Sequence, residues 1–156
     1  MQQERGIALN PSDIGSYVNL CLSNLWLGRP NKSIAIADKA ARLSPRDPYL
    51  PYFYWIKGGS YFMQERYDQA IEWERRSIEA DPDFVLPLID LAAALAQDHR
   101  DAEARDILAS YRAGGGPARS IADVSSWARM VSNNSVWQAY IDRVIEGVCK
   151  AGMPEE

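Results

Sequence analysis

The sequence lacks the features that identify a membrane protein, a metalloprotein or a disulfide-stapled protein. No run approaches the roughly 18 consecutive apolar residues that a membrane-spanning helix needs. The 156 residues include one histidine and two cysteines, and Cys21 and Cys149 lie far apart without metal-ligand spacing. These absences predict a soluble, cytoplasmic chain with reduced thiols, no membrane association, no metal and no other cofactor.

Signatures of catalysis and of nucleic-acid binding are also scarce. The glycines at 114–116 are not followed by the Lys-Ser or Lys-Thr of a phosphate-binding loop. His99 stands between Asp98 and Arg100 in a predicted turn, where a solvated role fits better than a catalytic one. The basic residues are scattered over a chain of net charge -4. We therefore expect no enzymatic activity and no nucleic-acid binding by this chain.

The sequence does contain enough apolar residues for a folded core, and it contains a sequence motif that recurs. Apolar residues make up 47% of the chain and aromatic residues 10%, which argues against disorder. Pro11 and Pro45 lie 34 residues apart, and Pro45 and Pro82 lie 37 apart. The phrase GRPNKSIAIADKAARLSP ending at Pro45 matches ERYDQAIEWERRSIEADP ending at Pro82, and HRDAEARDILASY repeats its first half. Three copies at this period indicate a repeat solenoid.

The repeated phrase resembles the tetratricopeptide family, whose units carry W-x2-L-G-x2-Y on a first helix and then A-x3-F and A-x4-P on a second. The matching positions are Tyr17, Leu20, Cys21, Asn24, Ser33, Ala37, Ala40 and Pro45 in unit one, Tyr54, Gly58, Tyr61, Ala70, Ser77 and Pro82 in unit two, and Leu88, Leu91, Ala92, Leu95, Ala104, Leu108 and Tyr111 in unit three. The resemblance implies an all-α solenoid of antiparallel helix pairs. We expect a partial repeat at 1–11, units at about 12–45, 48–82 and 83–113, and capping helices within 114–156.

Unit two departs from the family pattern at two positions. Lys57 stands where the family has leucine, and Glu74 stands where it has an aromatic residue. A buried charge without a partner costs several kcal/mol. We therefore expect Lys57 and Glu74 to face each other across the two helices of the unit.

The last 40 or so residues show helical spacing of their own. Apolar residues recur three and four apart near 120–131 and again over 136–150. A terminal repeat needs a cap, so we expect these helices to cover unit three and to bury Trp127, Trp137 and Ile141. The tail EGVCKAGMPEE resembles the end of repeat domains fused to bacterial class III adenylate or guanylate cyclases or to winged-helix regulators. That resemblance implies a fragment of a larger signalling protein with its output domain upstream, and we expect the chain to begin in mid-repeat.

The family geometry implies a binding groove on the concave side, which is lined by the first helix of each unit. The candidate peptide-binding residues are Val18, Asn19, Leu22, Trp26, Tyr52, Trp55, Ile56, Gly59, Phe62 and Met63, with Leu25, Leu86, Ile89, Asp90, Ala93 and Gln97 at further groove positions. The Lys, Asn and Arg set with which some relatives clamp a peptide carboxylate is mostly absent. An aromatic and aliphatic groove favours an apolar or helical segment of a partner protein. Two alternatives stay open: these side chains are simply core, or the chain is a structural or homodimerising segment of a cyclase or regulator.

Overall fold

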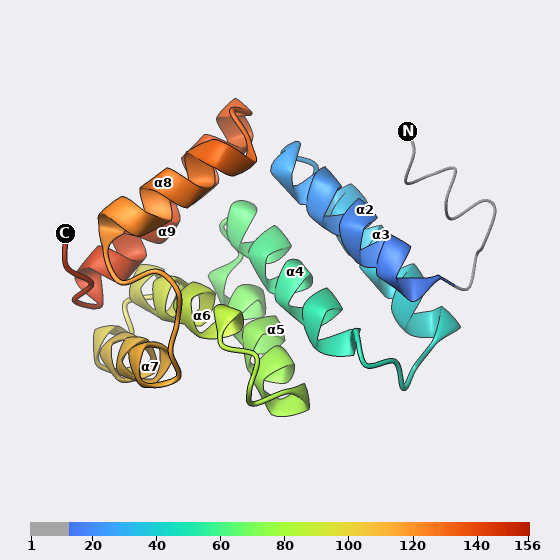
Figure 1. The fold of residues 1–156 in the computed structure, drawn as a ribbon, viewed down its shortest axis with the longest axis horizontal. Helices are drawn as coiled ribbons and strands as arrows, with labels where there is room; N and C mark the ends of the chain where they lie inside the picture. The colour runs from blue at the N-terminus through green and yellow to red at the C-terminus, as the bar shows by residue number, and fades with distance from the viewer. Residues whose placement is uncertain (1–12) are drawn as a thin grey trace.

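The computed structural model describes residues 13–156. In this range the chain forms α-helices joined by turns and loops, and it contains no strand (Figure 1). The partial repeat predicted at 1–11 lies outside the described residues. The helices are α2 (Ile14–Trp26), α3 (Pro30–Leu43), α4 (Leu50–Met63), α5 (Tyr67–Ala80), α6 (Leu86–Gln97), α7 (Asp101–Ala113), α8 (Ile121–Val131) and α9 (Ser135–Lys150).

The helices form successive pairs, α2–α3, α4–α5 and α6–α7, and each pair packs on the next (Figure 1). This arrangement confirms the expected all-α helix-pair solenoid. The helices of each pair fall inside the residue range predicted for one unit, while the division of the chain into repeats and cap stays a prediction. No helix of the described residues is both long and apolar enough to cross a membrane.

The turn inside each pair has the same backbone geometry. One residue in each turn adopts a left-handed conformation: Gly28 with φ 69°, Glu65 with φ 60° and His99 with φ 61°. The following amide then bonds back to the carbonyl five residues earlier, which satisfies an otherwise free group at the helix end. These bonds run from Arg29 N to Asn24 O (2.9 Å), from Arg66 N to Tyr61 O (3.0 Å) and from Arg100 N to Leu95 O (2.8 Å).

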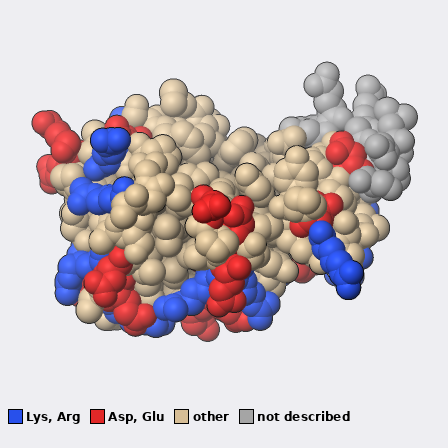
Figure 2. Space-filling view, turned by 60° about the horizontal axis from the view of Figure 1, so that its bottom comes forward, with Lys and Arg blue, Asp and Glu red and all other residues tan. Residues whose placement is uncertain are grey.

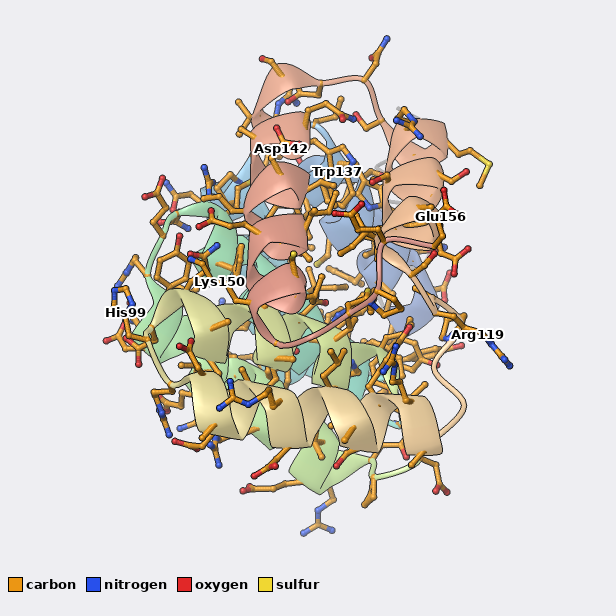
Figure 3. All side chains as sticks on the ribbon, turned by 90° about the vertical axis from the view of Figure 1, so that its left-hand side faces the viewer. His99, Arg119, Trp137, Asp142, Lys150 and Glu156 are labelled. Carbon is orange, nitrogen blue, oxygen red and sulfur yellow. The ribbon has the colours of Figure 1, made fainter. Side chains whose placement is uncertain are left out.

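His99 is therefore a backbone position, and replacing it with glycine is expected to stabilise the protein. Its side chain is exposed at the edge of the molecule (Figure 3), so no packing is lost. A Cβ in the left-handed region costs roughly 1 to 2 kcal/mol, and part of the gain is offset by the freedom of glycine in the unfolded chain. We expect the free energy of unfolding, measured by chemical denaturation, to rise by about 0.5 to 1 kcal/mol. His99→Ala keeps the Cβ, so equal gains from both variants would contradict this explanation.

The C-terminal hairpin α8–α9 has well-defined ends. The Ser120 hydroxyl accepts from Asp123 N, and the Asp123 carboxylate accepts from Ser120 N, which forms a capping box at the start of α8. At the start of α9, the Asn134 side-chain oxygen accepts from the backbone N–H groups of Val136 and Trp137. The chain end then returns to α8, where Ile121 N donates to the Pro154 carbonyl at 2.8 Å. The cap is thus fastened at the first turn of each of its helices.

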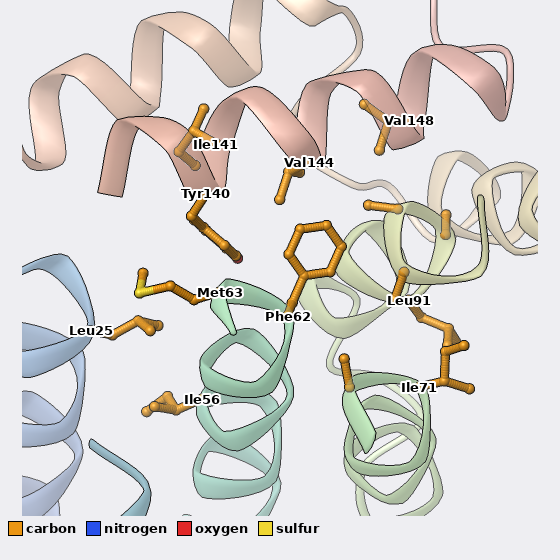
Figure 4. Packing of buried hydrophobic residues seen from close by; sticks show 14 of the residues in the cluster. Leu25, Ile56, Phe62, Met63, Ile71, Leu91, Tyr140, Ile141, Val144 and Val148 are labelled. Carbon is orange, nitrogen blue, oxygen red and sulfur yellow. The ribbon is translucent and has the colours of Figure 1, made fainter. Parts of the chain in front are cut away.

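Helix α9 packs on α6 and α4, and so it covers unit three, as expected, and part of the concave side as well (Figure 4). At Gly147 the α9 backbone lies so close to α6 that an added Cβ would be 2.6 Å from the Ala93 carbonyl oxygen. The Tyr140 ring meets Phe62 of α4 edge-on, with centroids 5.5 Å apart. At the other end of the cap, the Ser132 hydroxyl donates to Trp26 O of α2 at 2.9 Å. The cap therefore spans the repeats from α6 back to α2.

The burial expected for the cap is correct for two residues and wrong for one. Trp137 is 2% exposed and Ile141 is 3% exposed, whereas Trp127 is 45% exposed. Trp127 touches Trp137 edge-on, with ring centroids 5.9 Å apart. Trp127 stays partly exposed because α8 packs mainly on α9, and no further helix covers this side chain within the described residues.

Candidate binding site

A cavity of about 590 Å³ lies between the concave side of the repeats and the C-terminal cap. Helices α2, α4 and α6 supply one wall, and α8 with α9 supplies the other. This volume is typical of a site for a small ligand or for a few inserted side chains. The lining residues are Leu22, Leu25, Trp26, Trp55, Ile56, Gly59, Leu86, Ile89, Asp90, Tyr111, Pro117, Ala118, Asp123, Val124, Ser126, Trp127, Met130, Trp137, Tyr140, Ile141 and Val144.

Tryptophan dominates the cavity walls. Of the five tryptophans in the chain, Trp26, Trp55, Trp127 and Trp137 line the cavity, and Trp73 does not. The rim carries the most exposed apolar side chain of this region, Met130, which is 79% exposed. Aromatic residues and methionine are enriched at the centres of protein interfaces. The composition of the cavity is therefore that of a binding surface.

Asp90 of α6 is the charged group set into the aromatic wall. Its Oδ2 accepts a hydrogen bond of 2.6 Å from the Trp55 indole N–H. The Tyr140 hydroxyl also bonds to this carboxylate. Burial nevertheless raises the pKa of Asp90 to about 6, because both hydrogen bonds only partly offset the loss of water around the charge. Asp90 is thus ionised at neutral pH but poorly solvated.

The other lining carboxylate, Asp123, is already in use. It accepts bonds from the backbone N–H groups of Arg119 at 2.7 Å and Ser120 at 3.1 Å. These bonds hold the pKa of Asp123 below its usual value. Asp123 therefore serves the start of α8, and Asp90 is the lining carboxylate that can meet a ligand.

No lysine or arginine of the residues that the structure describes lines the cavity. On the face shown in Figure 2, acidic and basic side chains are interspersed along the lower part, and uncharged residues cover most of the upper part. The described residues include no group of three or more histidine, cysteine, aspartate or glutamate side chains that could hold a metal ion. The site offers hydrophobic contact, aromatic faces and one carboxylate.

The expected pairing of Lys57 with Glu74 is wrong. Lys57 instead contacts Asp38 of α3 at 2.7 Å, and its ammonium lies 3.4 Å from the centroid of the Trp73 ring. Glu74 is 1% exposed, and neither of its carboxyl oxygens has a hydrogen-bond partner. Its carboxyl group lies against Gly58, at a place where no larger residue would fit. Sequence spacing placed both residues on facing helices, but Lys57 forms its ion pair with Asp38 of α3 instead.

The unpartnered Glu74 is held in its neutral form. Burial and the nearby negative charge of Asp90 raise its pKa well above the usual value for glutamate. The same surroundings raise the pKa of Tyr140 well above the usual value, so its hydroxyl stays protonated. A cluster of buried and half-buried polar side chains therefore lies where α4, α5, α6 and α9 meet, and its members are Glu74, Asp90, Tyr140 and Trp55.

The residues predicted for the groove divide into three sets. Five of them line the cavity: Leu22, Trp26, Trp55, Ile56 and Gly59. Three are buried in the core away from it, namely Val18 (8% exposed), Phe62 (1%) and Met63 (6%), the last two beneath α9 (Figure 4). Two lie elsewhere: Asn19 is exposed, and Tyr52 stacks on Phe84 with ring centroids 4.5 Å apart. Among the further groove positions, Leu25, Leu86, Ile89 and Asp90 line the cavity, and Ala93 and Gln97 do not.

Sequence reasoning did not include the second wall in the site. Trp127, Met130, Trp137, Tyr140 and Val144 come from helices that were expected to serve only as an end cap. The signal was present in the apolar stripes of 120–131 and 136–150. Two consecutive helices with apolar stripes need more apolar surface to pack against than the end of unit three alone provides. A second contact of these helices, with the concave side of the repeats, was therefore to be expected.

Comparisons with known proteins bear on the fold. Neither a protein-family profile nor a curated protein matches the sequence. Among solved structures, that of PilW, described as a widely conserved type IV pilus biogenesis factor, aligns with a TM-score of 0.68 at 19% identity, covering 94% of this chain and 68% of that chain. The crystal structure of MamA aligns with a TM-score of 0.62 at 16% identity, covering 95% of this chain and 85% of that chain. At these identities the likeness establishes a shared helical-repeat fold.

Proposed function

We propose that this chain is a protein-interaction module, which holds an apolar or helical segment of a partner between its repeat helices and its C-terminal cap. The observation that carries the proposal is the cavity of about 590 Å³ walled by four tryptophans. Its volume suits a few side chains and is too small for a whole helix. The partner segment therefore lies along the rim, near Trp127 and Met130, and inserts its anchor residues between them.

The exposed rim supports this geometry. Trp127 and Met130 belong to α8, whose main helix contact is with α9. Large apolar side chains grouped at the mouth of an apolar cavity are the usual mark of a surface that another molecule covers. We assign no reaction to the site.

The role of the cavity can be tested with a defined probe, an amphipathic helical peptide of about 12 residues that carries leucine on one face. Trp55→Ala is expected to weaken its binding by about thirtyfold, which corresponds to roughly 2 kcal/mol, because Trp55 forms part of the inner wall. Isothermal titration calorimetry measures the affinity, and circular dichroism checks that the helical content is unchanged.

Trp73→Ala is the matched control, because Trp73 is the one tryptophan that does not line the cavity. It should leave the affinity for the peptide within about twofold of the starting value. Equal losses for both variants, or binding that survives Trp55→Ala unchanged in the folded protein, would show that the cavity is not the binding site.

The alternative is a dimerising or structural segment of a nucleotide cyclase or transcriptional regulator. Neither of the two structures reported above supports the resemblance of the tail to such proteins, and it stays a prediction. Sedimentation of the isolated chain separates the two functions. A concentration-dependent dimer that Trp127→Ala dissociates would favour the alternative, and a monomer at all concentrations would favour binding of a different partner.

A further inference from the structure

The carboxylate of Asp90 is a half-buried anion in an aromatic pocket, and no cation of the described residues balances it. Within residues 13–156, no lysine or arginine forms an ion pair with Asp90. A carboxylate accepts about four hydrogen bonds, and the Trp55 indole and the Tyr140 hydroxyl donate to it here. Asp90 therefore has room for a further donor, which must come from the cavity side.

The partly buried cations nearest to α4 are committed elsewhere. Lys57 is held by Asp38 at 2.7 Å. Arg143 of α9 donates to the Met63 carbonyl at 3.1 Å and lies 3.4 Å from the Glu65 carboxylate. Neither of these residues lines the cavity. The protein does not supply a cation to Asp90 from its own described side chains.

The same molecule shows what an indole and a carboxylate do when they are placed side by side. The Lys57 ammonium lies over the Trp73 ring and against the Asp38 carboxylate, so it receives both a cation–π contact and an ion pair. Trp55 and Asp90 also bring an indole next to a carboxylate, here with the indole N–H bonded to the carboxylate. This second pair faces a cavity, and no cation of the described residues lies between its members.

We propose that the cavity selects a partner segment whose apolar side chains surround one cationic group, a lysine ammonium or an arginine guanidinium, which lies against Asp90 and the Trp55 ring. The proposal rests on the interaction function proposed above and adds the chemistry of the partner. The apolar walls bind the apolar side chains of the partner segment, and the poorly solvated Asp90 carboxylate selects the positive charge. An anionic segment would be rejected, because it would bring a further negative charge into a cavity already lined by the carboxylates of Asp90 and Asp123.

The electrostatics of the neighbouring groups agree with this choice. The groups that face Asp90 are Trp55 of α4, Glu74 of α5, Tyr111 of α7 and Tyr140 of α9. Burial is the main cause that raises the pKa of Glu74, Tyr111 and Tyr140, and the negative charge of Asp90 adds to it, so each of them is neutral when Asp90 is charged. No positive charge among them competes with a bound cation.

The test uses the full chain and four helical peptides of about 12 residues that differ at one position. Three carry lysine, norleucine or glutamate in the middle of the leucine face, and the fourth carries the lysine on the opposite, solvent-exposed face. The lysine peptide should bind at least about tenfold more tightly than the norleucine peptide, and the glutamate peptide should bind least. The peptide with the displaced lysine should behave like the norleucine peptide, which excludes general attraction to a chain of net charge -4.

Asp90→Asn keeps a hydrogen-bond acceptor for the Trp55 indole and removes the charge, so it should abolish the preference for lysine over norleucine. Asp106→Asn removes an exposed carboxylate of α7, away from the cavity, and should leave the preference intact. If Asp90→Asn does not fold, the comparison of lysine with norleucine on the unaltered protein still decides the matter.

The outcomes separate this inference from the proposed function. Equal affinities for lysine and norleucine, or a preference that survives Asp90→Asn, would overturn the cationic selection while leaving the apolar docking site in place. Failure of all four peptides to bind at millimolar concentration would overturn the docking site and the inference together.

Discussion

Trp137→Ala is expected to lower the free energy of unfolding by about 3 to 5 kcal/mol, because it removes a buried aromatic side chain that packs between the two helices of the cap. Trp137 is 2% exposed, and its indole N–H donates to the Ala128 carbonyl of α8 at 3.2 Å. Its ring lies 5.0 Å from the ring of Tyr140, and Figure 3 shows it between α8 and α9. Removing it leaves a large void and takes one of two hydrogen bonds from the Ala128 carbonyl, which still accepts from Ser132 N at 3.3 Å. Chemical denaturation followed by circular dichroism measures the loss.

Trp127→Ala is the control for this prediction. The two tryptophans touch each other edge-on, but Trp127 is 45% exposed, so its truncation removes much less buried surface. We expect a loss below about 1 kcal/mol for Trp127→Ala. A loss as large as that of Trp137→Ala would mean that α8 contributes more to stability than its packing against α9 indicates.

Glu74→Met is expected to raise the free energy of unfolding by about 3 kcal/mol at pH 8, because it replaces a buried carboxyl group that has no partner with an apolar side chain of similar size. The contact with Gly58 excludes a bulky substitute, and methionine is flexible enough to fit.

The gain from Glu74→Met should depend on pH in a defined direction. The pKa of Glu74 is raised in the folded protein above the value of about 4.5 in the unfolded chain. Its contribution to stability is therefore fully present below about pH 4.5 and is lost as the pH rises through the folded value. The difference in unfolding free energy between Glu74→Met and the unaltered protein should grow from pH 4.5 to pH 8.

Comparing the two proteins at each pH cancels the titration of the other carboxyl groups, including Asp90, whose pKa of about 6 gives a dependence of the same sign. Glu79→Met, on the exposed side of the same helix, is the control and should change stability by less than about 0.5 kcal/mol at any pH. A gain from Glu74→Met that is the same at pH 4.5 and pH 8 would show that Glu74 is not held neutral in the folded protein.

The local rules of the sequence were sufficient for the helices and their pairing. Prolines and the recurring small residues predicted three helix pairs, and the structure contains them, each closed by a turn with one left-handed residue. Nearest-neighbour stacking in a solenoid depends on short-range periodicity, and periodicity is visible in a sequence. The helical spacing of the tail predicted α8 and α9 for the same reason.

The sequence alone could not decide which charged groups would pair. Lys57 lies on α4 and can reach either α5 or α3. Spacing within unit two favoured Glu74, whereas the packing of α3 on α4 brought Asp38 within 2.7 Å of the ammonium. Glu74 was then left without a partner against Gly58. The choice between two carboxylates on different helices depends on side-chain distances that repeat periodicity does not contain.

By itself, the sequence determined an all-α chain of helix pairs whose concave side is aromatic and aliphatic, because apolar spacing and turn residues act locally. Only the tertiary structure decided that the terminal hairpin returns as far as α2, that Phe62 and Met63 are buried under α9, and that Asp90 faces a cavity with Trp55. The reason is that the α8–α9 hairpin buries most apolar surface where the concave side of the repeats fits it. The contacts between them join residues about 100 positions apart in the sequence, such as Ser132 and Trp26. Pairings over such a distance follow from the shape of the folded solenoid, which fixes where its concave side and its cap meet.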